Sequence, residues 1–395
     1  MLKRTGRHLG SGTGMHLVDT TLFFSPTSGG VKRYLTAKHH WLRARTTWCH
    51  TILVPGECEH IAPGCISSLR GARLPGTFDY RLPLAPRRWA AVLDALEPDL
   101  IEAGDAFHPA WCAWHVGQRR GIPTVAFYHS NLPQIIGARL GSLGERTMQR
   151  YMRWLYGHFD AVFAPSRIMR DLLHALGIPH AIYQPLGVDA EIFNPRQRRA
   201  DIRSRLGVAP ATRLLIYAGR FAEEKNLPVL LHAFALLGRP YHLLLIGGNQ
   251  STRPTANVTM LPYRGDSGEL AQWLASADAL VHAGTRETFG LVALEAMACG
   301  RPVIATRAAA LPELIDGEVG VLAEPLSAAS MAAAIAHLYE RDHEAMGAAA
   351  RARVLAQHTW THTFQAQITA YANLAAAHRI PVPAQPIIEL GSPTS

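Results

Sequence analysis

Residues 287–303 have the sequence ETFGLVALEAMACGRPV and lie between two short apolar runs. The run before them, residues 279–283, predicts a strand, and the run that begins at Pro302 predicts the next strand. Between the two runs, a helix is predicted to open near Gly290 and to stop at Gly300. Its apolar residues recur at steps of three and four, at Leu291, Leu294, Met297 and Ala298. The stretch therefore predicts a βαβ unit whose helix packs on a parallel sheet.

Two carboxylates flank the start of this helix, Glu287 in the preceding loop and Glu295 about a turn and a half inside it. A helix N-terminus attracts anions, and ligands of open α/β sheets bind at the carboxyl ends of the strands. A carboxylate can also accept two hydrogen bonds from a vicinal diol. A sugar nucleotide offers both the anion and the diols. The alternative is a solvated loop glutamate and an ordinary helix glutamate, which the spacing alone does not exclude.

A second charged loop lies earlier in the chain, where residues 219–226 read GRFAEEKN. It follows a strand predicted at residues 213–219 and precedes a helix predicted at residues 227–237. The guanidinium of Arg220 and the ammonium of Lys225 would there hold a diphosphate and stabilise it as a leaving group. In isolation, both side chains could equally be exposed surface bases.

Together the two motifs resemble the donor site of retaining glycosyltransferases of family 4 (glycosyl transferases group 1). The resemblance implies an α/β protein of the GT-B fold, with two Rossmann-like domains facing each other across a cleft. It implies that Arg220 and Lys225 take up charge on the diphosphate and that Glu287 holds hydroxyls of the sugar. Glu295 would bind the ribose hydroxyls. Further donor contacts are implied at Gly219, Thr288, Phe289, Gly290 and Leu291.

The N-terminal half carries a Gly29-Gly30 turn between a strand predicted at residues 16–24 and a helix predicted from Val31. Such a turn lets the backbone approach a ligand closely, although a plain tight turn is the commoner reason for one. The resemblance implies that both glycines face the donor diphosphate and the acceptor. Lys32 and Arg33 add positive charge close by.

His129 ends a strand predicted at residues 123–128, at the edge of the sheet where ligand loops gather. A partly buried structural histidine is the alternative. The resemblance implies that His129 contacts the donor sugar or the acceptor, and so adds it to Arg220, Lys225 and Glu287 as a catalytic residue. Asn131 is expected on the acceptor side.

Residues 145–156, ERTMQRYMRWLY, predict a helix with an apolar face and a basic face. Arginines beside tryptophan and tyrosine are typical of a helix that lies at a membrane interface. A surface helix with one buried side explains the pattern as well. The basic face, expected to contact the acceptor or an anionic membrane, consists of Arg146, Arg150 and Arg153.

The 395 residues are enough for two domains, and their 48% hydrophobic and 17% charged content predicts a globular protein. No apolar run is long enough to span a membrane, and no signal peptide is recognisable. The five scattered cysteines favour reduced thiols, so we expect a cytoplasmic protein, peripheral on the inner face of the plasma membrane if the basic helix binds lipid. The expected division is a flexible tail (1–14), an N-terminal acceptor domain (15–190), a C-terminal donor domain (191–358), a helix returning to the N-terminal domain (359–380) and a second flexible tail (381–395).

The interpretation that follows is a retaining glycosyltransferase that moves a hexose from a nucleotide diphosphate sugar to a lipid or saccharide hydroxyl. The resemblance favours mannose from GDP-mannose, and leaves UDP-glucose or UDP-N-acetylglucosamine open. A sugar-nucleotide epimerase lacks the glutamate pair, and a non-catalytic binding protein that recognises nucleotide sugar or anionic lipid is the alternative from another class. The net charge of +9 suits anionic ligands or a membrane better than nucleic acid, because no nucleic-acid motif accompanies it. Neither a cofactor nor a metal ion is expected.

Overall fold

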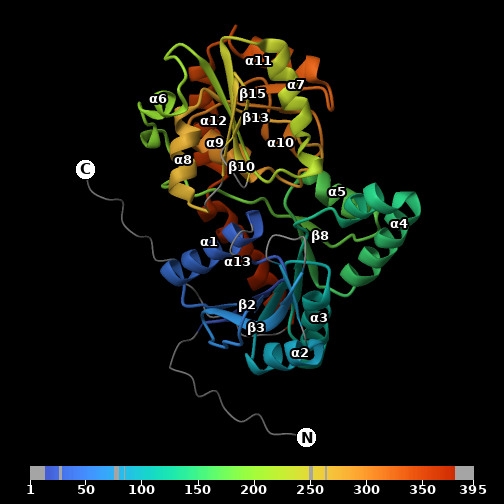
Figure 1. The fold of residues 1–395 in the computed structure, drawn as a ribbon. Coiled ribbons are helices and arrows are strands. Elements are labelled where there is room, and N and C mark those ends of the chain that lie inside the picture. The colour runs from blue at the N-terminus through green and yellow to red at the C-terminus, as the bar shows by residue number, and fades with distance from the viewer. Residues whose placement is uncertain are drawn as a thin grey trace, which may run out of the picture.

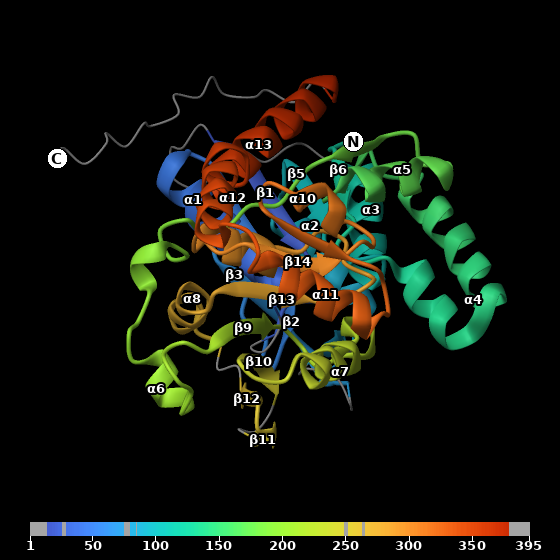
Figure 2. The same ribbon diagram turned by 90° about the horizontal axis from the view of Figure 1, so that it is seen from above.

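The computed structural model describes residues 14–25, 29–74, 80–83, 85–248, 252–262 and 265–378 (Figure 1). The predicted C-terminal tail and all but residue 14 of the predicted N-terminal tail lie outside these ranges. The described chain forms two twisted sheets, one from each half of the sequence, and each is flanked by helices (Figures 1 and 2). This is the α/β architecture with two Rossmann-like halves that the sequence predicts.

The first sheet has the strand order β4-β3-β2-β1-β5-β6-β7-β8 and is parallel except for β4. The short, fully buried strands β6 and β7 are apolar except for Thr124 at the start of β6, because helices cover both faces of a parallel sheet. Its strands are β1 (His16–Thr20), β2 (Cys49–Gly56), β3 (Ile66–Arg73), β4 (Arg81–Pro83), β5 (Leu100–Ala103), β6 (Thr124–Phe127), β7 (Ala161–Ala164) and β8 (Ala181–Tyr183). Its helices are α1 (Gly30–Arg45), α2 (Pro86–Ala95), α3 (His108–Arg120), α4 (Leu132–Tyr156) and α5 (Arg167–Ala175).

The second sheet has the order β11-β12-β10-β9-β13-β14-β15 and is parallel except for β11. Its strands are β9 (Arg213–Ala218), β10 (Tyr241–Gly248), β11 (Thr252–Thr255), β12 (Val258–Pro262), β13 (Ala279–His282), β14 (Val303–Thr306) and β15 (Gly320–Ala323). The helices of this half are α6 (Ile202–Leu206), α7 (Leu227–Leu237), α8 (Ser267–Ser276), α9 (Leu291–Ala298), α10 (Leu311–Leu314), α11 (Ala328–Leu338) and α12 (His343–Gln357), with short 3₁₀ turns η1 (Pro195–Gln197) and η2 (Glu223–Lys225).

The strand order reverses between β9 and β13, and the loops that follow these two strands are the two charged loops of the sequence. Because both strands are parallel, their carboxyl ends meet at one edge, which is where ligands bind in open α/β sheets. The first sheet reverses in the same way between β1 and β5. The loop after β1 leads to Gly29, and the next strand along from β5, which is β6, leads to His129.

The last helix, α13 (Trp360–Ala377), leaves the second half and packs against α1 of the first (Figure 1). Tyr371 accepts a hydrogen bond from the buried ammonium of Lys38 at 2.8 Å, and Trp41 donates one to Thr361 at 3.2 Å. Lys38 also contacts the buried carboxylates of Asp19 and Glu102, both at 3.0 Å. A buried polar cluster therefore fixes the C-terminal helix to the N-terminal sheet.

Several predicted boundaries were wrong. The first strand ends at Thr20 instead of residue 24, because the carboxylate of Asp105 takes the N–H of Leu22 at 2.6 Å and turns the chain. The charged residues 194–210 predict a linker, but they contain η1 and α6. The Ala-rich span 327–356 predicts one long helix, but it forms two, since Asp342 caps a new one. No helix in the described ranges is long and apolar enough to cross a membrane.

Candidate functional site

Lys225 and Glu287 meet at the edge between β9 and β13. Lys225 ends the turn η2 after β9, and Glu287 lies in the loop between β13 and α9, so the strand order alone brings the two loops together. The ammonium contacts the Glu287 carboxylate in an ion pair, and Nε2 of His282 lies 3.1 Å from the same oxygen. Burial alone would raise the pKa of Glu287, but Lys225 and His282 hold it well below its ordinary value of 4.5. The carboxylate is therefore fully ionised at neutral pH.

Asn226 holds the two loops in register. Its amide donates to the carbonyl of Ala283 at 3.0 Å and lies 3.2 Å from the hydroxyl of Thr285. Asn226 adopts a left-handed backbone conformation with φ of +51°, which asparagine tolerates better than most residues. This residue explains why a Lys-Asn pair suits the loop, since the lysine supplies the charge and the asparagine fixes its position.

Arg220 follows β9 in the same loop and remains 47% exposed on its side chain. Its guanidinium lies 3.9 Å from Glu224, at the outer limit of an ion pair. About half of this side chain is therefore accessible to an incoming anion. Gly219, immediately before it, has φ of +154°.

Glu295 lies in the second turn of α9 and is almost fully buried, at 2% exposure. Its Oε1 accepts a hydrogen bond from the guanidinium of Arg33, which reaches across from α1 of the first half. Burial raises the pKa of Glu295, and Arg33 opposes that rise. From the sequence, Arg33 is predicted only to add positive charge near the Gly-Gly turn, so this contact was missed.

The loop before α9 contacts the first half in two further places. The hydroxyl of Thr288 donates to the main-chain carbonyl of His129 at 3.0 Å. Gly30 lies so close to Leu291 that an added Cβ would stand 3.1 Å from its side chain. Gly290 caps α9 with φ of +104°, a conformation that favours glycine. The predicted donor residues of both halves therefore lie at one interface.

His129 is stacked on Phe127, with ring centroids 4.2 Å apart and an interplanar angle of 8°. Burial lowers its pKa to about 4, so the imidazole is neutral at pH 7. Its Nε2 is buried and has no hydrogen-bond partner among the residues that the structure describes. A neutral ring nitrogen in this position can bind a hydroxyl but cannot supply a positive charge.

The other predicted residues lie in different surroundings. Phe289 is buried and packs edge-on toward His358, at a centroid distance of 6.3 Å. Asn131 caps the N-terminus of α4, where its carbonyl oxygen accepts from the hydroxyl of Tyr128 at 3.0 Å. The arginines of the predicted basic face are all exposed along the second part of α4, at Arg146, Arg150 and Arg153.

Two residues of the interface were missed from the sequence. His282 is the last residue of β13, a position five before Glu287 that could have suggested a contact with it. Glu313 accepts the main-chain N–H groups of Arg167 at 2.8 Å and Ile168 at 2.6 Å, across the two halves. No local pattern marks Glu313, because its partners are about 145 positions away.

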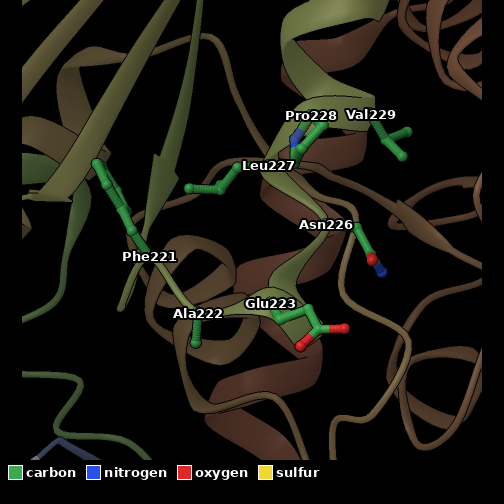
Figure 3. Close-up of a pocket in the computed structure, with 7 residues that line it drawn as sticks. All are labelled: Phe221, Ala222, Glu223, Asn226, Leu227, Pro228 and Val229. Carbon is green, nitrogen blue, oxygen red and sulfur yellow. The ribbon is translucent and has the colours of Figure 1, made fainter. Parts of the chain in front are cut away.

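Two cavities lie beside the charged residues. The larger, of about 400 Å³, follows the β9–α7 loop from Phe221 to the first turn of α7 and is shown in Figure 3. It includes Asn226 but neither Arg220 nor Lys225. The second, of about 240 Å³, lies between the halves and is lined by Arg167 and Tyr183 from one side and by Phe289, Glu313 and His358 from the other. The charged groups themselves are paired with one another.

Comparison with known protein families assigns both halves. The model of "Glycosyltransferase Family 4" matches residues 28–192, and that of "Glycosyl transferases group 1" matches residues 212–341. A GDP-mannose-dependent alpha-mannosyltransferase of Mycobacterium tuberculosis is 31% identical over 307 residues, which cover 74% of this chain and 79% of that protein. The GDP-mannose-dependent alpha-(1-6)-phosphatidylinositol dimannoside mannosyltransferase of the same species is 29% identical over 333 residues, covering 78% and 84%.

Solved structures show the same fold. Sucrose-phosphate synthase from Thermosynechococcus elongatus superposes with a TM-score of 0.77 at 22% identity, over 92% of this chain and all of that one. HepE of Anabaena, in complex with UDP and glucose, gives 0.72 at 19% identity, over 91% and 99%. With the family matches in both halves, this chain belongs to the family 4 (group 1) glycosyltransferases and is a transferase of the GT-B fold.

Proposed function

We propose that this glycosyltransferase is a retaining enzyme that moves mannose from GDP-mannose to a hydroxyl of a lipid or saccharide acceptor. The observation that carries the proposal is the Lys225–Glu287 ion pair at the carboxyl ends of β9 and β13. Two opposite charges held there serve a substrate that has both an anionic diphosphate and sugar hydroxyls. The mannose donor is favoured by the names of the two mycobacterial relatives, each of which is described as GDP-mannose-dependent.

In the proposed reaction, the bond between the sugar C1 and the diphosphate oxygen breaks while the acceptor oxygen bonds to C1 on the same face. The acceptor hydroxyl gives its proton to the departing phosphate oxygen. Lys225 and Arg220 stabilise the negative charge that grows on the diphosphate. Glu287 binds sugar hydroxyls, and neutral His129 offers its ring nitrogen to the sugar or the acceptor. The proposal includes no metal ion, because the two cations supply the charge a metal would otherwise bring.

Donor binding would use the N-terminal end of α9. The N–H groups at the start of α9, which Gly290 caps, would favour an anion, because the first N–H groups of a helix have no partner within the helix. Gly219, Thr288 and Phe289 flank the sheet edge where this helix starts. Gly30 approaches Leu291 of α9 from the other half, and Gly29 precedes it as the N-cap of α1, so the donor would lie between the halves.

A thermal-shift series with GDP, UDP, ADP and their common sugar conjugates tests the donor. A ligand that binds only the folded state raises its stability by mass action, by about 2.7 kcal/mol at one hundred times Kd. Stabilisation by GDP and GDP-mannose alone supports the proposal. Stabilisation by UDP compounds would leave the proposed glycosyl transfer intact but would identify the donor as UDP-glucose or UDP-N-acetylglucosamine instead of GDP-mannose. Binding without any transfer or hydrolysis of the donor would favour a non-catalytic binding protein.

We propose that the enzyme meets its acceptor at an anionic membrane and that α4 contacts this membrane. Gly141 breaks this helix with φ of +68°, and the two parts stand out from the body as a hairpin (Figures 1 and 2). Leu140 and Leu143 beside the break are 68% and 77% exposed, the highest values among large apolar side chains of the described ranges. The helix carries one acid, Glu145, against four arginines, Arg139, Arg146, Arg150 and Arg153.

Co-sedimentation with vesicles tests this contact. Leu140→Ser with Leu143→Ser, and separately Arg150→Glu with Arg153→Glu, should each weaken binding to phosphatidylglycerol vesicles, by loss of apolar insertion and of charge attraction respectively. Leu236→Ser is the control, since Leu236 is 66% exposed but lies on α7. If every variant co-sediments with vesicles as strongly as wild-type protein does, the proposed membrane contact is wrong. The proposed acceptor is then a soluble saccharide.

A further inference from the structure

The two carboxylate oxygens of Glu295 have different surroundings. Oε1 accepts a hydrogen bond from Nη1 of Arg33, whereas Oε2 is buried and has no hydrogen-bond partner within the described part of the chain. Leaving a buried charged acceptor unsatisfied is costly, so such an atom in a ligand cleft points to a missing donor group. The arrangement therefore leaves one oxygen for a ligand and uses the other to hold the carboxylate in place.

Arg33 and Glu295 belong to different halves of the protein. Arg33 lies in the first turn of α1, three residues after Gly30, and Glu295 lies in α9. Gly30 itself approaches Leu291 of α9, so the two helices meet at their N-terminal ends. The side chain of Arg33 is 24% exposed and that of Glu295 is 3% exposed, so the arginine is the member of the pair that solvent reaches more easily. The contact forms only when the two halves are together.

We propose that Arg33 is a positioning residue that acts through Glu295, presenting its free oxygen to a ribose hydroxyl of the donor nucleotide only when the two halves have closed. The inference rests on the proposed function and adds that binding of the ribose requires residues from both halves of the protein. A single orientation of Glu295 is set before the nucleotide arrives, so less freedom is lost on binding. The ribose site is accordingly built from both halves, although the carboxylate comes from one.

The protonation of Glu295 supports this role. Burial raises its pKa, and Arg33 is the cation that opposes the rise. Cys299, the C-cap residue of α9, is a second titratable group near Glu295 within the described ranges. Burial raises the pKa of its thiol to about 12, so the thiol stays uncharged at neutral pH. Without Arg33, the carboxyl would take up a proton at higher pH and lose an acceptor.

Calorimetric titration with GDP, 2′-deoxy-GDP and 3′-deoxy-GDP measures how much each ribose hydroxyl contributes. Hydrogen bonds to a charged group give wild-type protein a preference of roughly 10- to 100-fold for GDP over the analogue that lacks the bound hydroxyl. In Arg33→Gln we expect weaker GDP binding and a preference that falls to about threefold or less, because the hydroxyl has lost its oriented partner. Arg43→Gln, on an exposed site of the same helix, is the matched control and should retain the wild-type preference.

The pH dependence distinguishes positioning from general electrostatic attraction of the nucleotide. Because the terminal phosphate of GDP itself titrates at about pH 6, the quantity compared is the ratio of the GDP affinity of Arg33→Gln to that of wild-type protein at each pH between about 6 and 8. This ratio should rise with pH as Glu295 ionises in the variant, whereas a flat profile would mean that Arg33 acts only by general attraction. Arg33→Lys restores the charge, so the same ratio for this variant should depend less on pH. An unchanged deoxy preference in a folded Arg33→Gln protein would overturn the inference while leaving the proposed donor class intact.

If wild-type protein bound UDP instead of GDP, the same comparison would use UDP and 2′-deoxy-UDP. If it bound none of GDP, UDP and ADP, the proposed function would fail, and this inference with it. A loss of deoxy preference in Arg33→Gln together with normal binding of the analogue itself would support the inference most directly, since the analogue cannot use Glu295.

Discussion

Replacing Lys225 with methionine removes a positive charge while keeping most of the length and apolar surface of the side chain. In the folded protein this leaves Glu287 with His282 alone as its partner. The two residues of the ion pair are 17% and 16% exposed, so the charges are largely shielded from water. The substitution therefore changes both the stability of the cleft and its ability to bind a diphosphate.

The loss of stability follows from the burial of the pair. Two unit charges in contact attract by about 5 kcal/mol at an effective dielectric constant of 20, but removing both from water offsets much of that. Removing one partner of a fully buried pair costs about 3–5 kcal/mol. Because both side chains keep some contact with solvent and His282 remains, we expect Lys225→Met to lower the free energy of unfolding by about 2–3 kcal/mol.

The loss of activity should be larger and separable. An electrostatic contact made to charge that develops in the transition state is typically worth about 100- to 1000-fold in kcat. We expect that decrease in Lys225→Met at a temperature where the variant is fully folded, measured as donor hydrolysis and as transfer. Lys225→Arg keeps the charge and should recover part of the rate, which separates charge from shape.

Urea unfolding and steady-state kinetics on the same preparations complete the test. A kcat within threefold of the wild-type value would refute the assignment of Lys225 to the leaving group. A raised KM with an unchanged kcat would mean that Lys225 binds substrate and transition state equally. A decrease in kcat that parallels the unfolded fraction would show that the effect is structural only.

Three further predictions concern the same framework. Glu287→Gln should have a lower free energy of unfolding than wild-type protein at neutral pH, and the difference should shrink as pH falls below 4.5. The reason is that a carboxyl whose pKa is lowered in the folded protein contributes stability that is lost as pH falls toward that pKa. A pH-independent difference in the free energy of unfolding would contradict this. Lys38→Met leaves the buried carboxylates of Asp19 and Glu102 without their cation and should cost about 3–5 kcal/mol in urea unfolding, with an unchanged midpoint as the opposing result. Gly290→Ala forces alanine to φ of +104° and to within 3.0 Å of Leu311, so we expect about 1–2 kcal/mol of destabilisation and weaker nucleotide binding, whereas the unhindered Gly317→Ala should match wild-type protein in both.

The sequence predicted the second half of the fold more fully than the first. The helix at residues 227–237 has the predicted boundaries, because it is a mostly apolar run that Gly238 ends. The mostly apolar runs at residues 241–248 and 258–262 likewise predict strands, and the structure has strands with these bounds. The start of α4 was missed, since Pro133 and the glycines that follow it weaken the helical pattern although proline is tolerated in a first turn. Strands β3 and β4 carry few buried residues and leave little hydrophobic periodicity to detect.

The contacts of the candidate site could likewise be predicted from the sequence only in part. Lys225 and Glu287 could be paired from the sequence, because each follows a predicted parallel strand and such strands end at one edge. Arg33 and Glu295 are separated by 262 positions and lie on helices of different halves, so no local pattern links them. Which partner a charged side chain takes depends on how the two halves meet, and that is a property of the whole fold.

The chain passes between the two halves near Val188 and again near Thr359, and these passages pair with each other. Val188 donates its N–H to the carbonyl of His358 at 2.9 Å and accepts from Trp360 at 3.3 Å, while a Cβ on Gly187 would stand 2.6 Å from the Thr359 backbone. Because these two connecting segments are hydrogen-bonded to each other, we expect them to act as a single hinge, so that the halves open by rotation about one axis. When the halves open, contacts that lie farther from that axis separate by a larger distance. A bulkier residue at position 187 would therefore change how far the whole cleft opens without touching any group inside it.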